Sequence, residues 1–121
     1  MRPVLDTNVL IDFLSGVKKG KEEIDRYPRP RISIVTWMEV MVGARDDAEE
    51  DVMRAFLLCF EVEPLTAEVA AEAVKLRRTH RISLPDAVIW ATSRVCDCLL
   101  ITRNTDDFPA DDPGVRVPYE I

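Results

Sequence analysis

The chain has 121 residues with a formal net charge of −6, and 47% of its residues are apolar and 31% charged. These values suit one globular domain. No apolar run approaches the roughly 20 residues of a membrane span, and the N-terminus shows no apolar signal-peptide region, so we expect a cytoplasmic protein. The negative charge argues against a protein that coats nucleic acid with a basic surface, but it is compatible with an enzyme that holds nucleic acid through bound cations.

Short apolar runs alternate with helical patterns along the whole chain. Strands are expected at residues 3–6, 31–35, 61–63, 98–102 and within 115–121. Helices are expected at residues 7–16, 18–27, 36–44, 46–60, 66–80 and 83–95. This alternation is typical of a mainly parallel sheet with helices on both faces. The expected fold class is therefore α/β, a three-layer α/β/α sandwich with four to five central strands, in a single domain over residues 1–121.

The cysteines and the single histidine exclude several kinds of site. Cys59, Cys96 and Cys98 are an odd set, so buried thiols are expected rather than disulfides. One residue separates Cys96 from Cys98, whereas paired zinc ligands usually have two to four between them. His80 has no histidine partner, which excludes a nuclease with two catalytic histidines. We expect it at a solvated helix end, in a basic stretch that could contact phosphate.

Acidic residues follow the predicted strands, at the point where each strand ends. Asp6 ends the first strand, and Glu39 lies in the first turn of the helix after the second. Asp86 lies in the first turn of the helix before the last apolar strand, and Asp106 and Asp107 lie in the loop after it. Because the carboxyl ends of parallel strands share one edge, acids from four distant places are expected to converge there.

Each acid also has a purely structural explanation. Asp6 can cap the first helix, and Glu39 fits a capping box with Thr36. Asp86 fits the same pattern with Ser83, and the two later aspartates can be turn residues. Capping does not explain why the acids follow successive strand ends, whereas a shared cation does. Converging carboxylates repel one another without a cation, and hard oxygen ligands favour Mg²⁺ or Mn²⁺.

Four segments of the chain resemble the PIN-domain family, and in particular the VapC-type toxins of bacterial and archaeal toxin–antitoxin pairs. The segments begin at Leu5, Glu39, Leu84 and Ile101, and they read LDTNVLID, EVMVG, LPDAVIWA and ITRNTDDF. In this order they cover almost the whole chain. The resemblance implies a PIN-like fold and a Mg²⁺- or Mn²⁺-dependent endoribonuclease that cleaves single-stranded or loop RNA to leave a 3′-hydroxyl and a 5′-phosphate.

The resemblance also implies roles for individual residues. The acids that would hold the metal and activate water are Asp6, Glu39, Asp86 and Asp107. Asp107 is preferred to Asp106 because it directly precedes Phe108. The groups that would orient these carboxylates are Thr7, Asn8, Thr102 and Asn104. Family members usually form homodimers, and a small VapB-type antitoxin inhibits them by occupying the active-site groove.

RNA contacts are expected from Arg103, beside the proposed site, and from Arg45 and Arg77. Other interpretations stay open. A non-catalytic PIN-like module would bind RNA or protein, and a missing acid would signal it, but all four acids are present. A phosphohydrolase with Asp6 as nucleophile would usually show an Asp-x-Asp-x-Thr motif, which this chain lacks. A nuclease that matures rRNA or tRNA would share the chemistry of a toxin.

Overall fold

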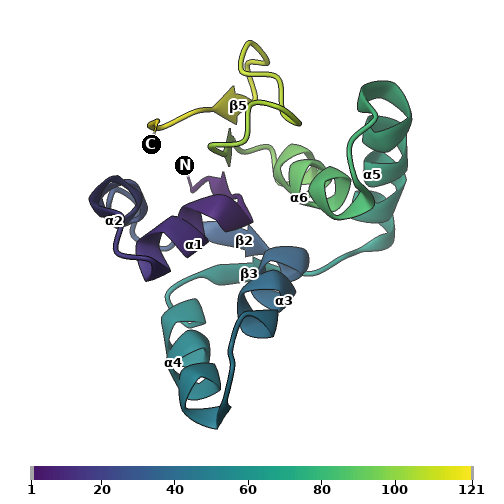
Figure 1. The fold of residues 1–121 in the computed structure, drawn as a ribbon. Coiled ribbons are helices and arrows are strands. Elements are labelled where there is room, and N and C mark those ends of the chain that lie inside the picture. Colours follow the sequence, from purple (N-terminus) through teal and green to yellow (C-terminus); the bar gives the residue numbers. More distant parts are fainter. Residues whose placement is uncertain (1, 121) are drawn as a thin grey trace.

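The structure is a computed structural model that describes residues 2–120 (Figure 1). The strands are β1 (Val4–Leu5), β2 (Arg31–Ser33), β3 (Glu61–Glu63), β4 (Leu100–Ile101) and β5 (Val115–Arg116). The helices are α1 (Thr7–Leu14), α2 (Lys18–Asp25), α3 (Ile34–Val42), α4 (Asp47–Leu57), α5 (Ala67–His80) and α6 (Leu84–Val95). The strands form one parallel sheet in the order β3-β2-β1-β4-β5. The predicted α/β class is confirmed.

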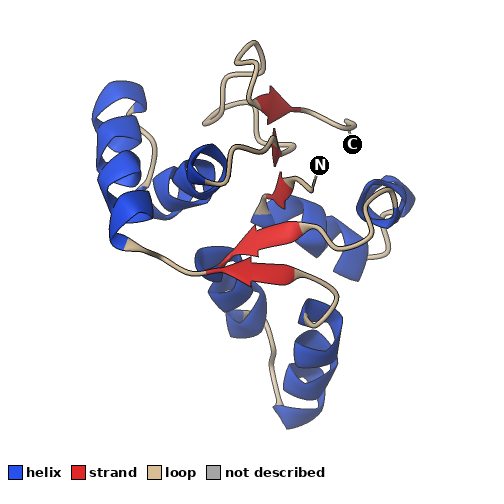
Figure 2. Cartoon of the chain, turned by 180° about the vertical axis from the view of Figure 1, so that it is seen from behind, coloured by secondary structure: helices blue, strands red, loops and turns tan. Residues whose placement is uncertain are grey.

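The central strands send alternate side chains into two separate cores. Val4 and Leu100 join a core with α5 and α6, which is built around Trp90. Leu5 and Ile101 join a second core with residues of α1, α3 and α4. This alternation follows from the two-residue period of a strand, and each fully buried aliphatic side chain stabilises the fold by roughly 1.5–3 kcal/mol. Figures 1 and 2 show α5 and α6 on one side of the sheet and α1 and α2 on the other, so the predicted three layers are confirmed.

Strand β1 occupies the centre of the sheet, and this position places the residue that follows it. Val4 pairs with Arg31 of β2 on one side and with Leu100 of β4 on the other. The Asp6 N–H donates to the Ile101 carbonyl at 2.8 Å, so β1 and β4 stay in contact one residue beyond β1. Because parallel strands end at one edge, the residues after β1, β2 and β4 lie close together there.

Helix α3 begins two residues earlier than the sequence pattern suggested. The hydroxyl of Ser33 accepts the N–H of Val35 at 3.0 Å, which makes Ser33 the N-cap and ends β2 at the same residue. The strand expected up to Val35 is therefore wrong beyond Ser33. The capping box expected for Thr36 and Glu39 is also wrong, because Thr36 already lies inside α3 and Glu39 lies in its second turn.

Other boundaries differ from the predictions at their ends. Helix α1 stops at Leu14, just before Gly16, whose backbone is left-handed with a φ of +82°. The strand expected at residues 98–102 pairs only over Leu100–Ile101. The last strand expected within 115–121 forms at Val115–Arg116, and residue 121 lies outside the described residues.

The cysteines are less buried than the sequence suggested. All three thiols are free, but Cys59 is exposed and Cys96 and Cys98 are only half-buried, so the expectation of buried thiols is wrong. Cys59 lies in the turn between α4 and β3, where its neighbours do not enclose it. Over residues 2–120, every helix is too short or too polar to cross a membrane.

Candidate active site

Asp6 is a buried carboxylate at the carboxyl edge of the central strand. The residue is 4% exposed and serves as the N-cap of α1. Its Oδ1 accepts the Thr7 N–H at 2.8 Å, and this bond is the predicted cap. Its Oδ2 accepts the Thr102 hydroxyl at 2.7 Å and the Asn8 side-chain amide at 3.2 Å. Capping therefore engages one oxygen, while Asn8 of α1 and Thr102, which follows β4, together fix the direction of the other.

The electrostatic surroundings of Asp6 disfavour its charged form. Burial raises its pKa from 3.8 to about 6, although the hydrogen bonds from Thr102 and Thr7 act in the opposite direction. The carboxylates of Asp86 and Glu39 raise this pKa further. Three of the predicted acids thus interact at the same sheet edge, and a cation placed there would stabilise the ionised form of Asp6.

Glu39 is joined to this edge through a threonine on the neighbouring helix. The Thr7 hydroxyl donates to Glu39 Oε1 at 2.7 Å, and the hydroxyls of Thr7 and Thr36 lie 2.9 Å apart. Glu39 is exposed, whereas Thr36 is fully buried. The Thr7–Thr36–Glu39 contacts therefore link α1 to α3, and they hold the Glu39 carboxylate in a place that helix capping does not explain.

Asp86 retains part of its predicted capping arrangement. Ser83 is the N-cap of α6, and its hydroxyl accepts the Asp86 N–H at 3.3 Å. Burial raises the pKa of the Asp86 carboxyl, a hydrogen bond with Ser83 lowers it, and the carboxylates of Asp107 and Glu39 raise it. Asp86 is therefore close to Asp107, and two such carboxylates favour a shared proton or a cation.

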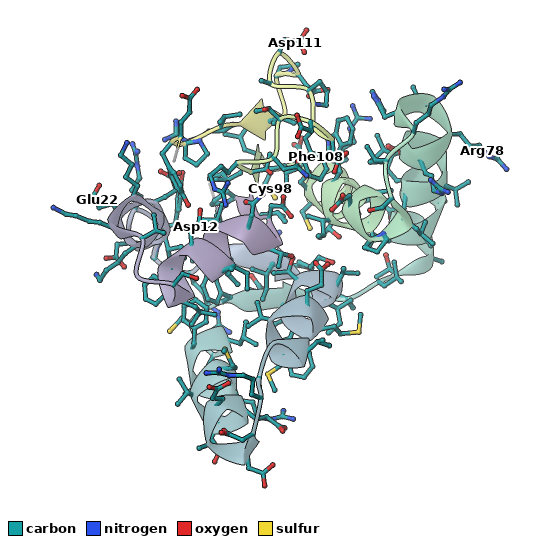
Figure 3. All side chains as sticks on the ribbon, viewed as in Figure 1. Asp12, Glu22, Arg78, Cys98, Phe108 and Asp111 are labelled. Atoms are coloured by element: carbon teal, nitrogen blue, oxygen red, sulfur yellow. The ribbon has the colours of Figure 1, made fainter. Side chains whose placement is uncertain are left out.

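The loop after β4 carries Asp107 to the site. The Asn104 amide donates to Asp107 Oδ2 at 2.9 Å, and the Asp107 N–H donates back to Asn104 Oδ1 at 3.3 Å. Phe108 is fully buried with its ring 5.8 Å from that of Trp90, which anchors the end of the loop on α6 (Figure 3). Asp106 is exposed, whereas Asp107 is half-buried. Of the two adjacent aspartates, Asp107 is the one that interacts with Asp86.

Among the described residues, the four acids have no cationic partner. Within residues 2–120, none of the ion pairs includes Asp6, Glu39, Asp86 or Asp107. In the same part of the chain, no three Asp, Glu, His or Cys side chains lie close enough to form a ready-made metal cage. The predicted convergence is thus a line of acids along one edge, linked through Thr7 and through the Asp86–Asp107 contact.

The arginines expected to contact RNA have protein partners in this structure. Arg103 forms a bidentate ion pair with Asp12, with Nε 2.7 Å from Oδ2 and Nη2 3.0 Å from Oδ1. Arg45 pairs with Glu49 at an exposed position, where its guanidinium can exchange partners at little cost. Arg77 donates to the Ile82 carbonyl at 2.6 Å and so supports the end of α5. Arg103 is the only one of the three that borders the acidic edge.

Sequence reasoning missed two further buried acids, Asp12 and Glu23. They are 5% and 3% exposed, and both bind residues of the C-terminal segment. Glu23 lies among charged neighbours on α2, whereas Asp12 is the only charged residue of α1. Neither context indicated a buried ion pair, because Arg103, Tyr119 and Arg116 lie 91 to 107 residues away in sequence. His80 was expected at a solvated helix end; it is exposed at the end of α5, but its ring also lies 4.7 Å from that of Trp90.

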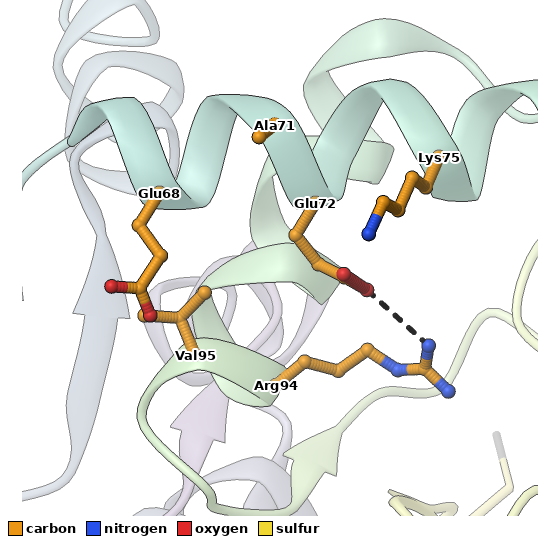
Figure 4. A pocket seen from close by; sticks show the side chains of 6 residues that line it. All are labelled: Glu68, Ala71, Glu72, Lys75, Arg94 and Val95. Carbon is orange, nitrogen blue, oxygen red and sulfur yellow. Dashed lines mark hydrogen bonds and ion pairs between the residues drawn. The ribbon is translucent and has the colours of Figure 1, made fainter.

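A separate pocket lies between α5 and α6, as Figure 4 shows. Glu68, Glu72 and Lys75 line it from α5, and Arg94 and Val95 line it from α6. An ion pair between Glu72 and Arg94, with an N–O distance of 3.4 Å, crosses it. None of the four edge acids lines this pocket, so it is distinct from the candidate site.

Solved structures with the same fold include a toxin–antitoxin complex. A chain of a toxin–antitoxin complex from Klebsiella pneumoniae matches with a TM-score of 0.92 and 43% identity, over 98% of this chain and 99% of that one. FitAcB from Neisseria gonorrhoeae matches with a TM-score of 0.79, over 98% and 99% of the two chains. At 24% identity, the second match supports the fold alone.

Comparisons at the sequence level agree with the fold. Ribonuclease VapC10 of Mycobacterium tuberculosis (strain CDC 1551 / Oshkosh) is 36% identical over 126 aligned positions, which cover 98% of this chain and 93% of that protein. The family model of the PIN domain matches residues 4–110, a range that contains all four edge acids and the loop that carries Asp107. The chain therefore belongs to the PIN domain family.

Proposed function

We propose that this chain is a Mg²⁺- or Mn²⁺-dependent endoribonuclease and the toxin of a toxin–antitoxin pair. The observation that carries the proposal is Asp6, a buried carboxyl with a raised pKa that lies beside two further acids and has no ion-pair partner within residues 2–120. A relative that is 36% identical over nearly its whole length is named a ribonuclease. A cytoplasmic location, expected from the sequence, is part of the same proposal.

The residues at the edge fit a divalent cation by their chemistry. Asp6, Glu39, Asp86 and Asp107 supply hard oxygen ligands. The pKa values of Asp6 and Asp86 are raised first by burial and further by neighbouring carboxylates. A preformed cage is not required, because Mg²⁺ keeps several waters and usually takes one or two carboxylates. When bound, the ion would lower the pKa of a coordinated water and neutralise charge on the phosphodiester.

The chain's own hydrogen bonds would keep this site in a fixed arrangement. Thr102 holds Asp6 Oδ2 at 2.7 Å, and Asn8 reaches the same oxygen from α1 at 3.2 Å. Thr7 holds Glu39, and Asn104 holds Asp107. These neighbours orient the carboxylates before RNA binds, which reduces the reorganisation that the reaction requires. They are the residues to which we assign the orienting role.

Asp107 is proposed as the fourth acid, in preference to Asp106. Asp107 interacts with Asp86 and is held by Asn104, whereas Asp106 is exposed to solvent. Asp106 gives a matched control, because Asp106→Asn removes one negative charge from the same loop and keeps the interaction between Asp107 and Asp86.

The deciding experiment is cleavage of a structured RNA by the purified protein, with Mg²⁺, with Mn²⁺ and with EDTA. We expect Asp6→Asn and Asp86→Asn to reduce cleavage on the order of a hundredfold or more, because each removes a charged ligand. Asp107→Asn should behave like them, and Asp106→Asn like the original chain. Cleavage that survives EDTA, or that both Asp6→Asn and Asp86→Asn retain, would overturn the assignment.

The same samples separate the alternative functions. A non-catalytic module would bind RNA in a mobility-shift assay and leave it intact under every metal condition. A phosphohydrolase with Asp6 as nucleophile would form an acid-stable phosphoaspartate that Asp6→Asn abolishes. Slow growth on expression, relieved by Asp6→Asn, would support a toxin over a nuclease that matures cellular RNA.

An antitoxin partner is proposed from the Klebsiella pneumoniae relative, which belongs to a toxin–antitoxin complex. A groove between α1, α3 and α4 offers a place for an apolar helix, and its apolar lining includes Ile11, Leu14, Val52 and Met53. Ile11 and Val52 are 41% and 62% exposed, so the groove is uncovered in the isolated chain. Co-expression with the neighbouring short reading frame, followed by light scattering, tests both the complex and the expected homodimer.

A further inference from the structure

We propose that Asp12 and Tyr119 are positioning residues that hold Arg103 and thereby fix the side chain of Asn8 against Asp6. The inference rests on the proposed function in one respect, namely that Asp6 belongs to the catalytic site. It assigns a role to the C-terminal segment, whose Tyr119 lies 107 residues from Asp12 in sequence.

The Asp12 carboxylate accepts hydrogen bonds from two side chains. Arg103 donates to both oxygens of Asp12, at 2.7 and 3.0 Å, and the Tyr119 hydroxyl donates to Oδ2 at 2.7 Å. Asp12 is 5% exposed, so these charge-assisted bonds form largely out of water, where they are strong and directional. Burial, and then Asp12, raise the pKa of Tyr119, which keeps its hydroxyl protonated as a donor.

Helix α2 packs closely against Asp12 and the Tyr119 hydroxyl. Gly20 of α2 faces the Asp12 side chain, and a Cβ at that position would lie 3.0 Å from Asp12 Cβ and 3.2 Å from the Tyr119 hydroxyl. Helix α2 therefore approaches α1 closely only because residue 20 has no side chain. Figure 3 shows Asp12 on α1, the helix that lies beside α2. The tail, α1 and α2 thus meet at one buried point.

Arg103 in turn contacts Asn8, which is bonded to Asp6 at the acidic edge. The backbone N–H of Arg103 donates to Asn8 Oδ1 at 3.3 Å. The Nδ2 of the Asn8 side chain donates to Asp6 Oδ2 at 3.2 Å and to the Thr102 hydroxyl at 3.4 Å. An asparagine amide has an acceptor end and a donor end, so the bond that one end makes determines where the other points. If Arg103 moves away, the Asn8 amide can rotate and present its oxygen to a carboxylate that repels it.

The structure supplies a matched control on the same tail. Glu23 accepts the Tyr27 hydroxyl at 3.0 Å and binds Arg116 of β5 at 3.3 Å, so it forms a second buried carboxylate–tyrosine–arginine group. This group also anchors the C-terminal segment, but none of its hydrogen bonds reaches Asn8 or Arg103. Tyr27→Phe removes the same kind of bond as Tyr119→Phe, without the connection to Asp6.

The test compares Tyr119→Phe, Asp12→Asn and Tyr27→Phe by ¹⁵N NMR without metal and by RNA cleavage with Mg²⁺. In Tyr119→Phe and Asp12→Asn we expect the Arg103 backbone and Asn8 side-chain amide resonances to shift. We also expect kcat to fall about tenfold with little change in KM, as for other groups that orient a ligand. Tyr27→Phe should leave both quantities unchanged while altering thermal stability to a similar extent.

The outcomes separate this inference from the proposed function. If Tyr119→Phe and Tyr27→Phe give the same Asn8 spectrum and the same kcat, the tail is a general anchor and the positioning role is wrong. If no variant cleaves RNA, the proposed function fails, but the NMR comparison still decides whether Tyr119 controls Asn8. Should Asp12→Asn fail to fold, Tyr119→Phe decides alone, because it removes one hydroxyl and keeps the ring.

Discussion

Two groups of buried carboxylates in this fold have opposite surroundings. Asp12 and Glu23 each bind an arginine and a tyrosine, so their charges are compensated. Asp6 is equally buried, but its partners are threonine, asparagine and a backbone N–H, and its charged neighbours are other acids. Burial alone therefore does not mark a functional acid. A buried carboxylate without a cationic partner does indicate one, because burying an uncompensated charge costs free energy that a bound ligand can offset.

Removing a compensated acid should give the largest loss of stability. In Glu23→Ala, Arg116 and Tyr27 lose their buried partner, and the free energy of unfolding should fall by about 3 to 4 kcal/mol. Urea unfolding at pH 7 measures this change, and RNA cleavage by the folded fraction should persist. A change below about 1 kcal/mol would show that Glu23 is no better compensated than a surface acid.

The uncompensated acid should make the metal-free protein less stable as the pH rises. The folded-state pKa of Asp6 is raised to about 6, so between about pH 4 and 6 the folded state binds more protons than the unfolded state. The stability that protonated Asp6 provides is complete below about pH 4 and lost as the pH passes 6, which amounts to about 3 kcal/mol. Urea titrations in EDTA across this range measure the loss.

Asp6→Asn is the control for that titration, because asparagine has no charge to bury. The variant should lack the Asp6 contribution to the pH dependence and be more stable than the original chain at pH 7. Equal pH dependence in both proteins would show that Asp6 is not the uncompensated group.

A divalent cation should stabilise the uncompensated acids around Asp6 and not the compensated acids Asp12 and Glu23. At a Mg²⁺ concentration about a hundred times the Kd, binding to the folded state adds about 2.7 kcal/mol. Differential scanning fluorimetry should show a rise in Tm for the original chain and for Glu23→Ala, and none for Asp6→Asn. A rise that persists in Asp6→Asn would place the ion elsewhere.

The smallest effect on stability is expected from removing the Ser83 N-cap of α6. Ser83→Ala removes the acceptor for the Asp86 N–H and should destabilise the protein by about 1 kcal/mol, with cleavage largely retained. Asp86→Asn should show the reverse, with little loss of stability and a large loss of cleavage, because the pKa of its carboxyl is raised by burial. If both variants only destabilise, capping explains Asp86.

The order of elements and the sheet edge where the four acids lie could be predicted from the sequence because both depend on local patterns. Apolar runs of strand length that alternate with helical stripes require a covered parallel sheet, and a parallel sheet brings its strand ends to one edge. That reasoning placed Asp6 and Asp107 at the correct edge. It failed where a cap competed with β-branched residues, since Ser33 starts α3 before Ile34 and Val35 can extend β2.

The sequence by itself determined the fold class and the sheet edge where the acids lie, and their catalytic role stays a prediction. Only the tertiary structure decided which acids are compensated, because Asp12 meets Arg103 and Tyr119 across 91 and 107 residues of sequence. It also decided that Asp107 rather than Asp106 interacts with Asp86. Charge compensation depends on distances between side chains from different elements, and no local pattern encodes such distances.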